Sequence, residues 1–385
     1  MIYILQMNTN EFTDTSVLTA LKQEKACQVE RGREIIDLSM INPDLAPPRL
    51  LLDRLIEASM KPYNHRYAVA RGIRKLREAF AQKYARRFSV QLDAESQICV
   101  TMGTKDALFN VLRCLTKPGA SVILGTPTYP VHAAAARLAH LECCYFAIEA
   151  DPLAMVRNIS RLATESGARV VLLNFPNNPT GQVVGAEFYK ALSEVAIRLG
   201  LFVLNDFVYG EMGLKTQAIS MLALSGAANW GAETYSLSKA YNVPGWRVGA
   251  LLGNARVVSQ LAELKSLVDY GVFLPIQIAA AAALQSQEDL VAPTVANYNL
   301  RLSLLLRGLT RLGWELNAPQ AGCSVWAKLP SAHRALGATG FCQRLLREHA
   351  VVALPGEIFG SEFKAWVRFA AVMPEERIQS VLDKL

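Results

Sequence analysis

The chain has 385 residues, of which 51% are hydrophobic and 19% are charged, a composition typical of a globular protein with a sizeable core. This balance excludes an intrinsically disordered chain, and at roughly 100–200 residues per domain the length predicts two domains, or one large domain with a smaller partner. The formal net charge is +7, but Lys and Arg are scattered among Asp and Glu, so we expect no nucleic-acid partner.

The seven cysteines form no CxxC pair and have no His at metal-ligand spacing. We therefore expect reduced thiols, no metal site and a cytoplasmic location. Cys143 and Cys144 lie side by side in an apolar stretch, which favours a buried strand. Residues 1–12 have no basic start, and the apolar runs are too short for a membrane span, so we expect neither a signal peptide nor membrane insertion.

Short β-rich segments alternate with helical patterns in the middle of the chain. Residues 97–101 alternate like a strand, and residues 104–115 carry apolar side chains at helical spacing before Pro118-Gly119 ends the helix. Further strands are expected at 121–125, 143–148, 169–175, 201–206, 234–238 and 248–253, with a helix over 187–198. This alternation predicts an α/β fold with a doubly wound, mostly parallel sheet, in which ligands bind at the carboxyl ends of the strands.

The pattern changes near residue 288. A long amphipathic stretch over 295–312 is followed by the β-rich segments SVWAKL and WVRFAAV, which together predict a smaller α+β domain over 288–385. A large domain is expected over 46–287. Residues 1–45 carry weaker signals, and we expect them to pack with the small domain or across a subunit contact.

The segment with the sharpest chemical signal runs from Ser236 to Gly249 and reads SLSKAYNVPGWRVG. A lysine at a strand end, such as Lys239, has a lowered pKa when it is partly desolvated near other cations, so its free amine can form an imine. The guanidinium of Arg247 offers bidentate binding to a phosphate, and Ser236 and Ser238 add hydroxyl donors. By itself a lysine in this setting is most often a loop residue, but together these groups predict an anchor for a phosphorylated aldehyde.

This segment resembles the cofactor-lysine signature of the class I/II aminotransferases, fold type I enzymes that depend on pyridoxal 5'-phosphate. The resemblance implies that Lys239 forms a Schiff base with the cofactor and that Arg247 binds its phosphate. Residues 174–181, NFPNNPTG, resemble the NPTG loop of the family, whose asparagine, here Asn178, hydrogen-bonds the ring oxygen of the cofactor.

Two further segments resemble the parts of the family that contact the cofactor ring. In NDFVY the resemblance pairs Asp206 with the pyridine nitrogen and Tyr209 with the phenolic oxygen. A buried carboxylate has a clear task there, because it keeps the ring nitrogen protonated and makes the ring an electron sink. A lone Asp after a strand is also a common helix cap. Tyr129, in TPTYP, matches the aromatic residue that stacks on the ring, and is otherwise a core tyrosine.

Gly103, Thr104 and Lys105 lie between a predicted strand and a predicted helix, so backbone N–H groups and the helix dipole could hold a phosphate. They resemble the phosphate loop of the family, although strand–Gly–helix turns are frequent in α/β proteins. The pair Lys105-Asp106 is unusual, since other polar pairs often stand at these positions.

Tyr67, in HRYAVARG, resembles the tyrosine that reaches across the dimer interface to the partner's cofactor phosphate, which implies a homodimer with shared sites. Arg368, in WVRF, resembles the arginine that binds the substrate α-carboxylate. Ile41 stands where the family usually has a glycine close to that carboxylate. Its side chain either narrows the mouth of the pocket or points away from it.

The resemblance covers residues 35–372 and is closest to alanine-aminotransferase-like bacterial members. It implies reversible transfer of an amino group between an L-amino acid and a 2-oxo acid, with Lys239 as base and acid beside Asp206 and Tyr209. The substrate-binding residues would be Arg368, Asn178 and Ile41. One alternative is a pathway-specific enzyme on the same scaffold that performs β- or γ-elimination, replacement or cyclisation. A binding module without catalysis is disfavoured, because the chemical residues are all present.

Overall fold

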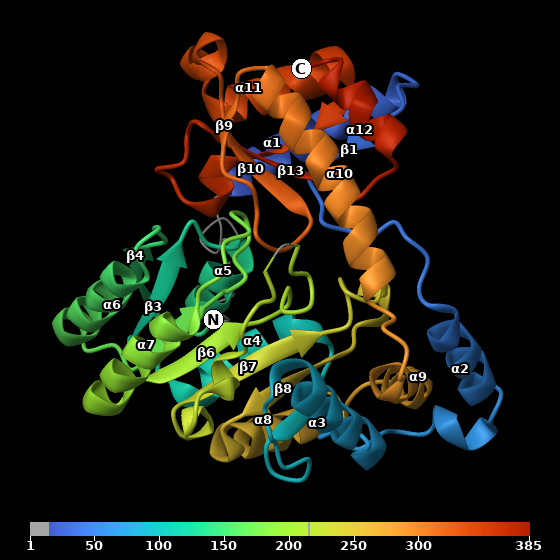
Figure 1. Ribbon diagram of the computed structural model, residues 1–385, viewed down its shortest axis with the longest axis vertical. Helices are drawn as coiled ribbons and strands as arrows, with labels where there is room; N and C mark the ends of the chain where they lie inside the picture. Colours follow the sequence, from blue (N-terminus) through green and yellow to red (C-terminus); the bar gives the residue numbers. More distant parts are fainter. Residues whose placement is uncertain (1–14, 215) are drawn as a thin grey trace, which may run out of the picture.

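The computed structural model describes residues 15–214 and 216–385 of the chain. Figure 1 shows a lower layer around a seven-stranded sheet and an upper layer that contains both the first helix and the last. The order in the large sheet is β2-β8-β7-β6-β5-β3-β4. The strands are β2 (Ile98–Thr101), β3 (Ser121–Thr126), β4 (Glu142–Ala147), β5 (Val170–Leu173), β6 (Phe202–Asp206), β7 (Gly231–Ser236) and β8 (Gly249–Gly253).

Strand β8 is antiparallel to both of its neighbours, and the other strand pairs are parallel. The α/β fold with a mostly parallel sheet is therefore confirmed. The predicted strands agree with the observed ones to within a few residues. The largest difference is at β7, which begins at Gly231 instead of residue 234. Its early part is hard to recognise because it carries Glu233, a fully buried charged residue.

Helices cover both faces of the sheet because alternate strand residues point to opposite sides. Val122 and Leu124 pack against α4, α5 and α8, whereas Ile123 belongs to the cluster formed with α3, α6, α7 and α9. These helices are α3 (Arg74–Phe88), α4 (Gly103–Leu115), α5 (Pro130–Leu138), α6 (Pro152–Ser166), α7 (Ala186–Leu199), α8 (Ala255–Val268) and α9 (Leu274–Gln285). Beside α9 lie α2 (Arg49–Ser59) and the 3-10 helix η2 (Pro62–His65).

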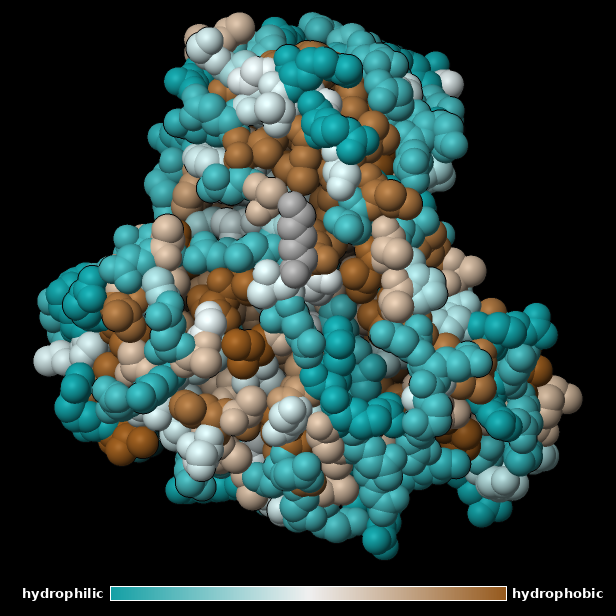
Figure 2. Space-filling model, viewed as in Figure 1, coloured by the Kyte–Doolittle hydropathy of each residue, from teal (hydrophilic) through white to brown (hydrophobic). Residues whose placement is uncertain are grey.

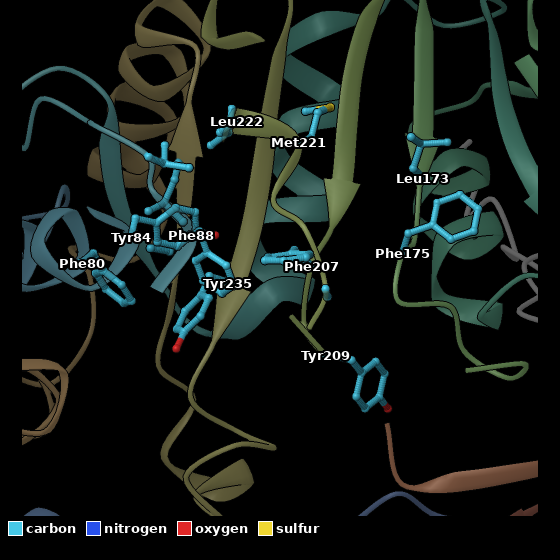
Figure 3. Packing of buried hydrophobic residues seen from close by; sticks show 14 of the residues in the cluster. Phe80, Tyr84, Phe88, Leu173, Phe175, Phe207, Tyr209, Met221, Leu222 and Tyr235 are labelled. Atoms are coloured by element: carbon cyan, nitrogen blue, oxygen red, sulfur yellow. The ribbon is translucent and has the colours of Figure 1, made fainter. Parts of the chain in front are cut away.

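Aromatic rings fill the cluster on the α3 face. Tyr84 packs against Phe88 and Tyr235 with ring centroids 5.1 and 5.7 Å apart, and Figure 3 shows these rings grouped near Phe207. Tyr209 lies apart from this group in the same view. The aromatic rings thus pack on the α3 face of the sheet, while Tyr209 lies in the loop that follows β6.

The strand expected at Cys143 and Cys144 is present, but the expectation that it is buried is wrong. Both residues lie on β4, but β4 is an edge strand and the two side chains are half-buried. An apolar run alone does not distinguish an edge strand from a central one, because pairing order depends on the whole sheet. All seven cysteines are unpaired. Within residues 15–214 and 216–385, no cluster of His, Cys, Asp and Glu could hold a metal ion, and no helix is long and apolar enough to cross a membrane.

The upper layer contains a four-stranded sheet of order β12-β13-β10-β9 and a parallel pair of β1 with β11. Its strands are β1 (Ile36–Asp37), β9 (Glu315–Leu316), β10 (Ser324–Lys328), β11 (Val351–Val352), β12 (Leu354–Pro355) and β13 (Trp366–Ala370). Its helices are α1 (Thr15–Glu30), α10 (Ala292–Arg311), α11 (Gly337–His349) and α12 (Glu375–Leu382). Short 3-10 helices complete the chain: η3 (Met221–Ala223), η4 (Ala227–Asn229), η5 (Pro244–Trp246), η6 (Ser331–Leu336) and η7 (Gly356–Phe359).

The early part of the chain packs on the late part. Leu21, Ile36 and Leu38 share a hydrophobic cluster with residues from α10, α11, α12 and the four-stranded sheet, and α1 contacts α11 (Figure 1). The backbone N–H of Leu38 donates to the carbonyl of Val352. Residues 1–14, for which packing with this layer and the absence of a signal peptide were also expected, lie outside the described residues.

The docking of this early segment can be tested through Leu38, which is fully buried. We expect Leu38→Ala to lower the free energy of unfolding by about 2–5 kcal/mol, since it removes buried methyl groups and leaves a cavity. Ile197→Ala is the matched control, because Ile197 is 70% exposed on α7, and it should cost less than about 0.5 kcal/mol. Denaturant unfolding measures the free energy of unfolding of both variants. An equally small decrease in the two would contradict the packing of this early segment on the upper layer.

Candidate active site

A cavity of about 670 Å³ lies where the carboxyl ends of the large sheet's strands face the upper layer. Figure 2 shows apolar side chains gathered near this junction of the two layers. Parallel strands end at the same edge, so the loops that follow them converge there. Twelve residues predicted from the sequence line the cavity: Ile41, Thr104, Lys105, Tyr129, Asn178, Asp206, Tyr209, Ser236, Ser238, Lys239, Arg247 and Arg368.

Lys239 follows β7 and lies in this cavity, with its Nζ donating to the backbone carbonyl of Ile41. Burial lowers the pKa of Lys239 to about 8, and the positive charges of Arg368 and Arg247 act in the same direction. Roughly a tenth of the amine is therefore unprotonated at pH 7, several hundred times more than for an ordinary lysine. This is the state that a nucleophilic amine requires.

Asp206, the last residue of β6, is 2% exposed and has two side-chain partners. Its Oδ2 lies 3.0 Å from Nε2 of His132, and its Oδ1 accepts a hydrogen bond from Oγ1 of Thr234 at 2.8 Å. His132 in turn lies 3.3 Å from Oγ1 of Thr128 through Nδ1. These contacts fix the orientation of a buried carboxylate in the cavity.

The sequence reasoning missed His132 and Thr234. The only sequence signal for His132 is that a histidine interrupts an alanine-rich apolar helix three residues after Tyr129. In the folded chain the rings of Tyr129 and His132 are in contact, with centroids 5.5 Å apart. Nothing in the sequence relates it to Asp206, which is 74 positions away. The contact exists because α5 packs against the large sheet in the folded chain.

Asn178 and Arg368 join the two layers across the cavity. Nη1 of Arg368 donates to Oδ1 of Asn178 at 3.0 Å, and Nη2 donates to the carbonyl of Ser39. The Asn178 backbone N–H donates to Asn174, whose side chain donates to the carbonyl of Asp206 at 2.7 Å. Nε of Arg368 is buried without a hydrogen-bond partner among the described residues. A buried arginine with a free donor fits an anionic ligand such as a carboxylate.

The groups at the other end of the cavity are suited to binding an anion. Nη2 of Arg247 donates to the carbonyl of Met102 at 3.2 Å, so the guanidinium lies against the start of α4. Gly103 has a φ of +75°, and a Cβ there would come within 2.5 Å of that Nη2. Oγ of Ser236 donates to Oγ of Ser238 at 2.8 Å. A helix N-terminus, an arginine and two hydroxyls together suit a phosphate.

Tyr67 does not line the cavity of its own chain. Its side chain is 88% exposed, and its ring lies 5.2 Å from the ring of Tyr270. Ile41 does line the cavity, while its side chain also packs against the main hydrophobic cluster. The structure thus lines the cavity with every predicted site residue except Tyr67 and Gly103, and the missing side chain of Gly103 leaves room for the Arg247 guanidinium.

The chain belongs to the family described as aminotransferase class I and II, which matches residues 33–385. It is similar to the glutamate-pyruvate aminotransferase AlaC of Escherichia coli K12, with 36% identity over 361 residues that cover 91% of this chain and 86% of that protein. An LL-diaminopimelate aminotransferase of Dehalococcoides mccartyi (strain ATCC BAA-2266) is 32% identical over 358 residues, or 92% of this chain and 91% of that protein.

Solved structures agree with this assignment. Substrate-bound BacF from Bacillus subtilis has a TM-score of 0.86 and 30% identity, covering 95% of this chain and 93% of that one. A double mutant of Thermus thermophilus aspartate aminotransferase has a TM-score of 0.88 and 25% identity over 95% and 94%. The protein is therefore a pyridoxal-phosphate-dependent aminotransferase of fold type I, as predicted. The relatives are aminotransferases, which favours amino transfer over elimination, replacement or cyclisation.

The lowered pKa of Lys239 gives a pH prediction. In cofactor-free protein, pyridoxal should condense with Lys239 at a rate that rises roughly tenfold per pH unit up to about pH 8 and then levels off, because only the free amine reacts. Absorbance of the imine measures the rate. The same reaction with N-acetyl-lysine methyl amide, divided by the unprotonated fraction of that amine, corrects for the ionisation of pyridoxal. A corrected rate that climbs steadily to pH 10 would contradict the low pKa.

Proposed function

We propose that Lys239 holds pyridoxal phosphate as a Schiff base and that the protein transfers an amino group between an L-amino acid and a 2-oxo acid at this site. One observation carries the proposal: the half-buried Lys239 shares a single cavity with the Asp206 carboxylate, Arg247 and Arg368. When bound, the cofactor supplies an electron sink for the bonds at the substrate Cα. The remaining chemistry falls to side chains of the chain.

Lys239 would act as base and acid: it would take a proton from the substrate Cα and deliver it to the C4′ position of the cofactor. A pKa of about 8 suits this task, since a proton-transfer group works best near the operating pH. Asp206 would keep a proton on the pyridine nitrogen, and its bonds to His132 and Thr234 orient its carboxylate. These three residues therefore set how strongly the ring attracts electrons.

Tyr209 and Asn178 would bind the phenolic oxygen of the cofactor. Burial raises the pKa of Tyr209 well above its ordinary value, so its hydroxyl remains a hydrogen-bond donor. Tyr129 would stack on the ring. The phosphate would be bound at the other end of the cavity by Thr104, Lys105, Ser236, Ser238 and Arg247, with the backbone of Gly103 directly before Thr104.

Arg368 would bind the substrate α-carboxylate, with its buried Nε as an additional donor. Because Arg368 also bonds Asn178 and Ser39, the carboxylate would be placed relative to both layers. A substrate held in this way presents its Cα–H to Lys239. Ile41 lines the same wall, and we propose that its branched side chain limits the space beside the carboxylate.

We propose that the protein is a homodimer in which Tyr67 reaches the partner's phosphate. Its 88% exposure is unusual for a large aromatic residue. It belongs to a group of exposed apolar residues on neighbouring elements, as expected of a subunit interface. This group comprises Ile56, Met60, Tyr63, Tyr67, Val69, Leu267, Val268, Tyr270 and Phe273.

We also propose the division into an N-terminal segment over 1–45, a large domain over 46–287 and a small domain over 288–385. The separate hydrophobic cluster of the upper layer supports it, since that cluster combines residues before 39 with residues after 301. A cytoplasmic location is proposed from the seven unpaired cysteines, which a reducing compartment would maintain.

The assignment of Lys239 is tested by borohydride reduction of the purified protein and peptide mass spectrometry. We expect the label on Lys239, and Lys239→Ala should be colourless and lose roughly 10²–10⁴-fold or more in the rate of 2-oxo acid formation from a panel of L-amino acids. Lys190→Ala, a change at an exposed position on α7, should retain colour and rate. A label on any other lysine would overturn the assignment.

The shared site is tested with hybrid dimers. Tyr67→Phe should weaken pyridoxal phosphate binding by roughly tenfold, the usual effect of losing a hydrogen bond to a charged group. In a hybrid of one Tyr67→Phe chain and one Lys239→Ala chain, the single working site has a normal tyrosine from its partner. We expect wild-type affinity at that site by absorbance titration, whereas continued weak binding would show that Tyr67 acts within its own chain.

A further inference from the structure

Asp106, the unusual acidic residue after the phosphate loop, has a defined place in the structure. Its Oδ2 accepts a hydrogen bond from the backbone N–H of Met102 at 2.8 Å, and its Oδ1 accepts one from Asn110 at 2.7 Å. Met102 directly precedes Gly103 and also accepts a bond from Arg247 through its carbonyl. The Asp106 carboxylate thus holds the backbone on which the phosphate-binding groups depend.

This carboxylate is bound by a lysine from a distant helix. Lys265, on α8, is fully buried, and its Nζ lies 2.6 Å from Oδ2 of Asp106 and 2.6 Å from Oδ2 of Asp269. Burial by itself lowers the pKa of Lys265, but the two carboxylates outweigh it and raise the pKa above the ordinary value. Lys265 is therefore a buried cation between two anions, an arrangement that is sensitive to the loss of any one member.

The second carboxylate shapes the turn that carries Tyr270. Oδ1 of Asp269 accepts a hydrogen bond from the backbone N–H of Gly271 at 2.7 Å, which holds Tyr270 at a φ of +54°. A Cβ on Gly271 would lie 2.8 Å from the carbonyl of Val69, so this turn packs closely on the segment that follows Tyr67. The rings of Tyr270 and Tyr67 are 5.2 Å apart.

We propose that Lys265 is a positioning residue that ties the start of α4 to the Tyr270 turn. This one buried cation thereby affects two things: the affinity for the phosphate in its own protomer and the position of Tyr67 relative to the partner's site. This inference rests on the proposed function, in which Arg247 and the start of α4 bind the cofactor phosphate and Tyr67 acts across the dimer.

The proposal distinguishes phosphate binding from general stability. Lys265→Met in the full-length protein should weaken binding of pyridoxal phosphate to the cofactor-free enzyme by roughly tenfold or more, the range for residues that orient direct ligands. Binding of pyridoxal, which has no phosphate, should change less than about twofold. Lys83→Met is the matched control, since Lys83 is also a largely buried lysine, 2.6 Å from Glu211, but does not contact the phosphate loop. It should leave the ratio of the two affinities unchanged.

Asp106→Asn provides a second variant in case Lys265→Met fails to fold. It keeps the size of the side chain and an oxygen for the Met102 N–H but removes the negative charge, so we expect the same selective loss with a smaller magnitude. Equal weakening of pyridoxal and pyridoxal phosphate by either variant would overturn the proposal, because it would show a purely structural role.

Hybrid dimers test the effect on the partner's site. When Lys265→Met and Lys239→Ala are placed on one chain and the other chain is wild type, the single working site has a normal phosphate loop. It receives Tyr67 from the altered chain, so we expect weaker pyridoxal phosphate binding than in a hybrid with Lys239→Ala alone. Equal affinity would overturn the coupling. Failure of the proposed function is recognised separately, because borohydride reduction of the wild-type protein would then leave no label on Lys239.

Discussion

The removal of Lys239 from water is the constraint on which the site depends. The amine lies in a cavity with Arg247, Arg368 and Lys105, and both burial and these positive charges disfavour its protonated form. The surroundings are therefore suited to anions, at one end a phosphate and at the other a carboxylate. The cations that add to the effect of burial on the pKa of Lys239 are also those proposed to bind these groups.

The two layers of the molecule meet at this cavity through a small number of polar contacts. Arg368 extends from β13 of the upper layer to Asn178 beyond β5 of the lower layer, and it also bonds the carbonyl of Ser39. Asn174 continues the chain of contacts to the backbone of Asp206. A change in the relative position of the layers would alter the contacts of both Arg368 and Asn178. In the proposed function, this would couple binding of the substrate carboxylate to the geometry at Asp206.

Residues outside the proposed ligand contacts hold the residues that are proposed to make them. His132 and Thr234 orient Asp206, and Gly103 leaves the space that the Arg247 guanidinium occupies. Lys265 pairs with Asp106 near the start of α4 and with Asp269 in the turn before Tyr270, whose ring contacts that of Tyr67. These supporting residues come from α5, β7, α4 and α8, which meet only because the strands and helices assemble into one sheet structure.

Local patterns in the sequence determined the order of elements and the mostly parallel sheet, because hydrophobic periodicity is a local property. The residues that line the cavity were predicted from short motifs that resemble those of the aminotransferase family, and several of these motifs follow parallel strands, whose carboxyl ends gather at one edge. The motif around Lys239 needs only neighbours along the chain, and so do the segments around Asn178 and Asp206.

Only the tertiary structure decided the rest. It placed Cys143 and Cys144 on an edge strand, paired His132 with Asp206, buried Lys265 between Asp106 and Asp269, and left Tyr67 exposed. Each of these outcomes depends on contacts between residues far apart in the chain or on the order of strands. Such contacts follow from how whole elements pack, and a single sequence carries no local signal for them.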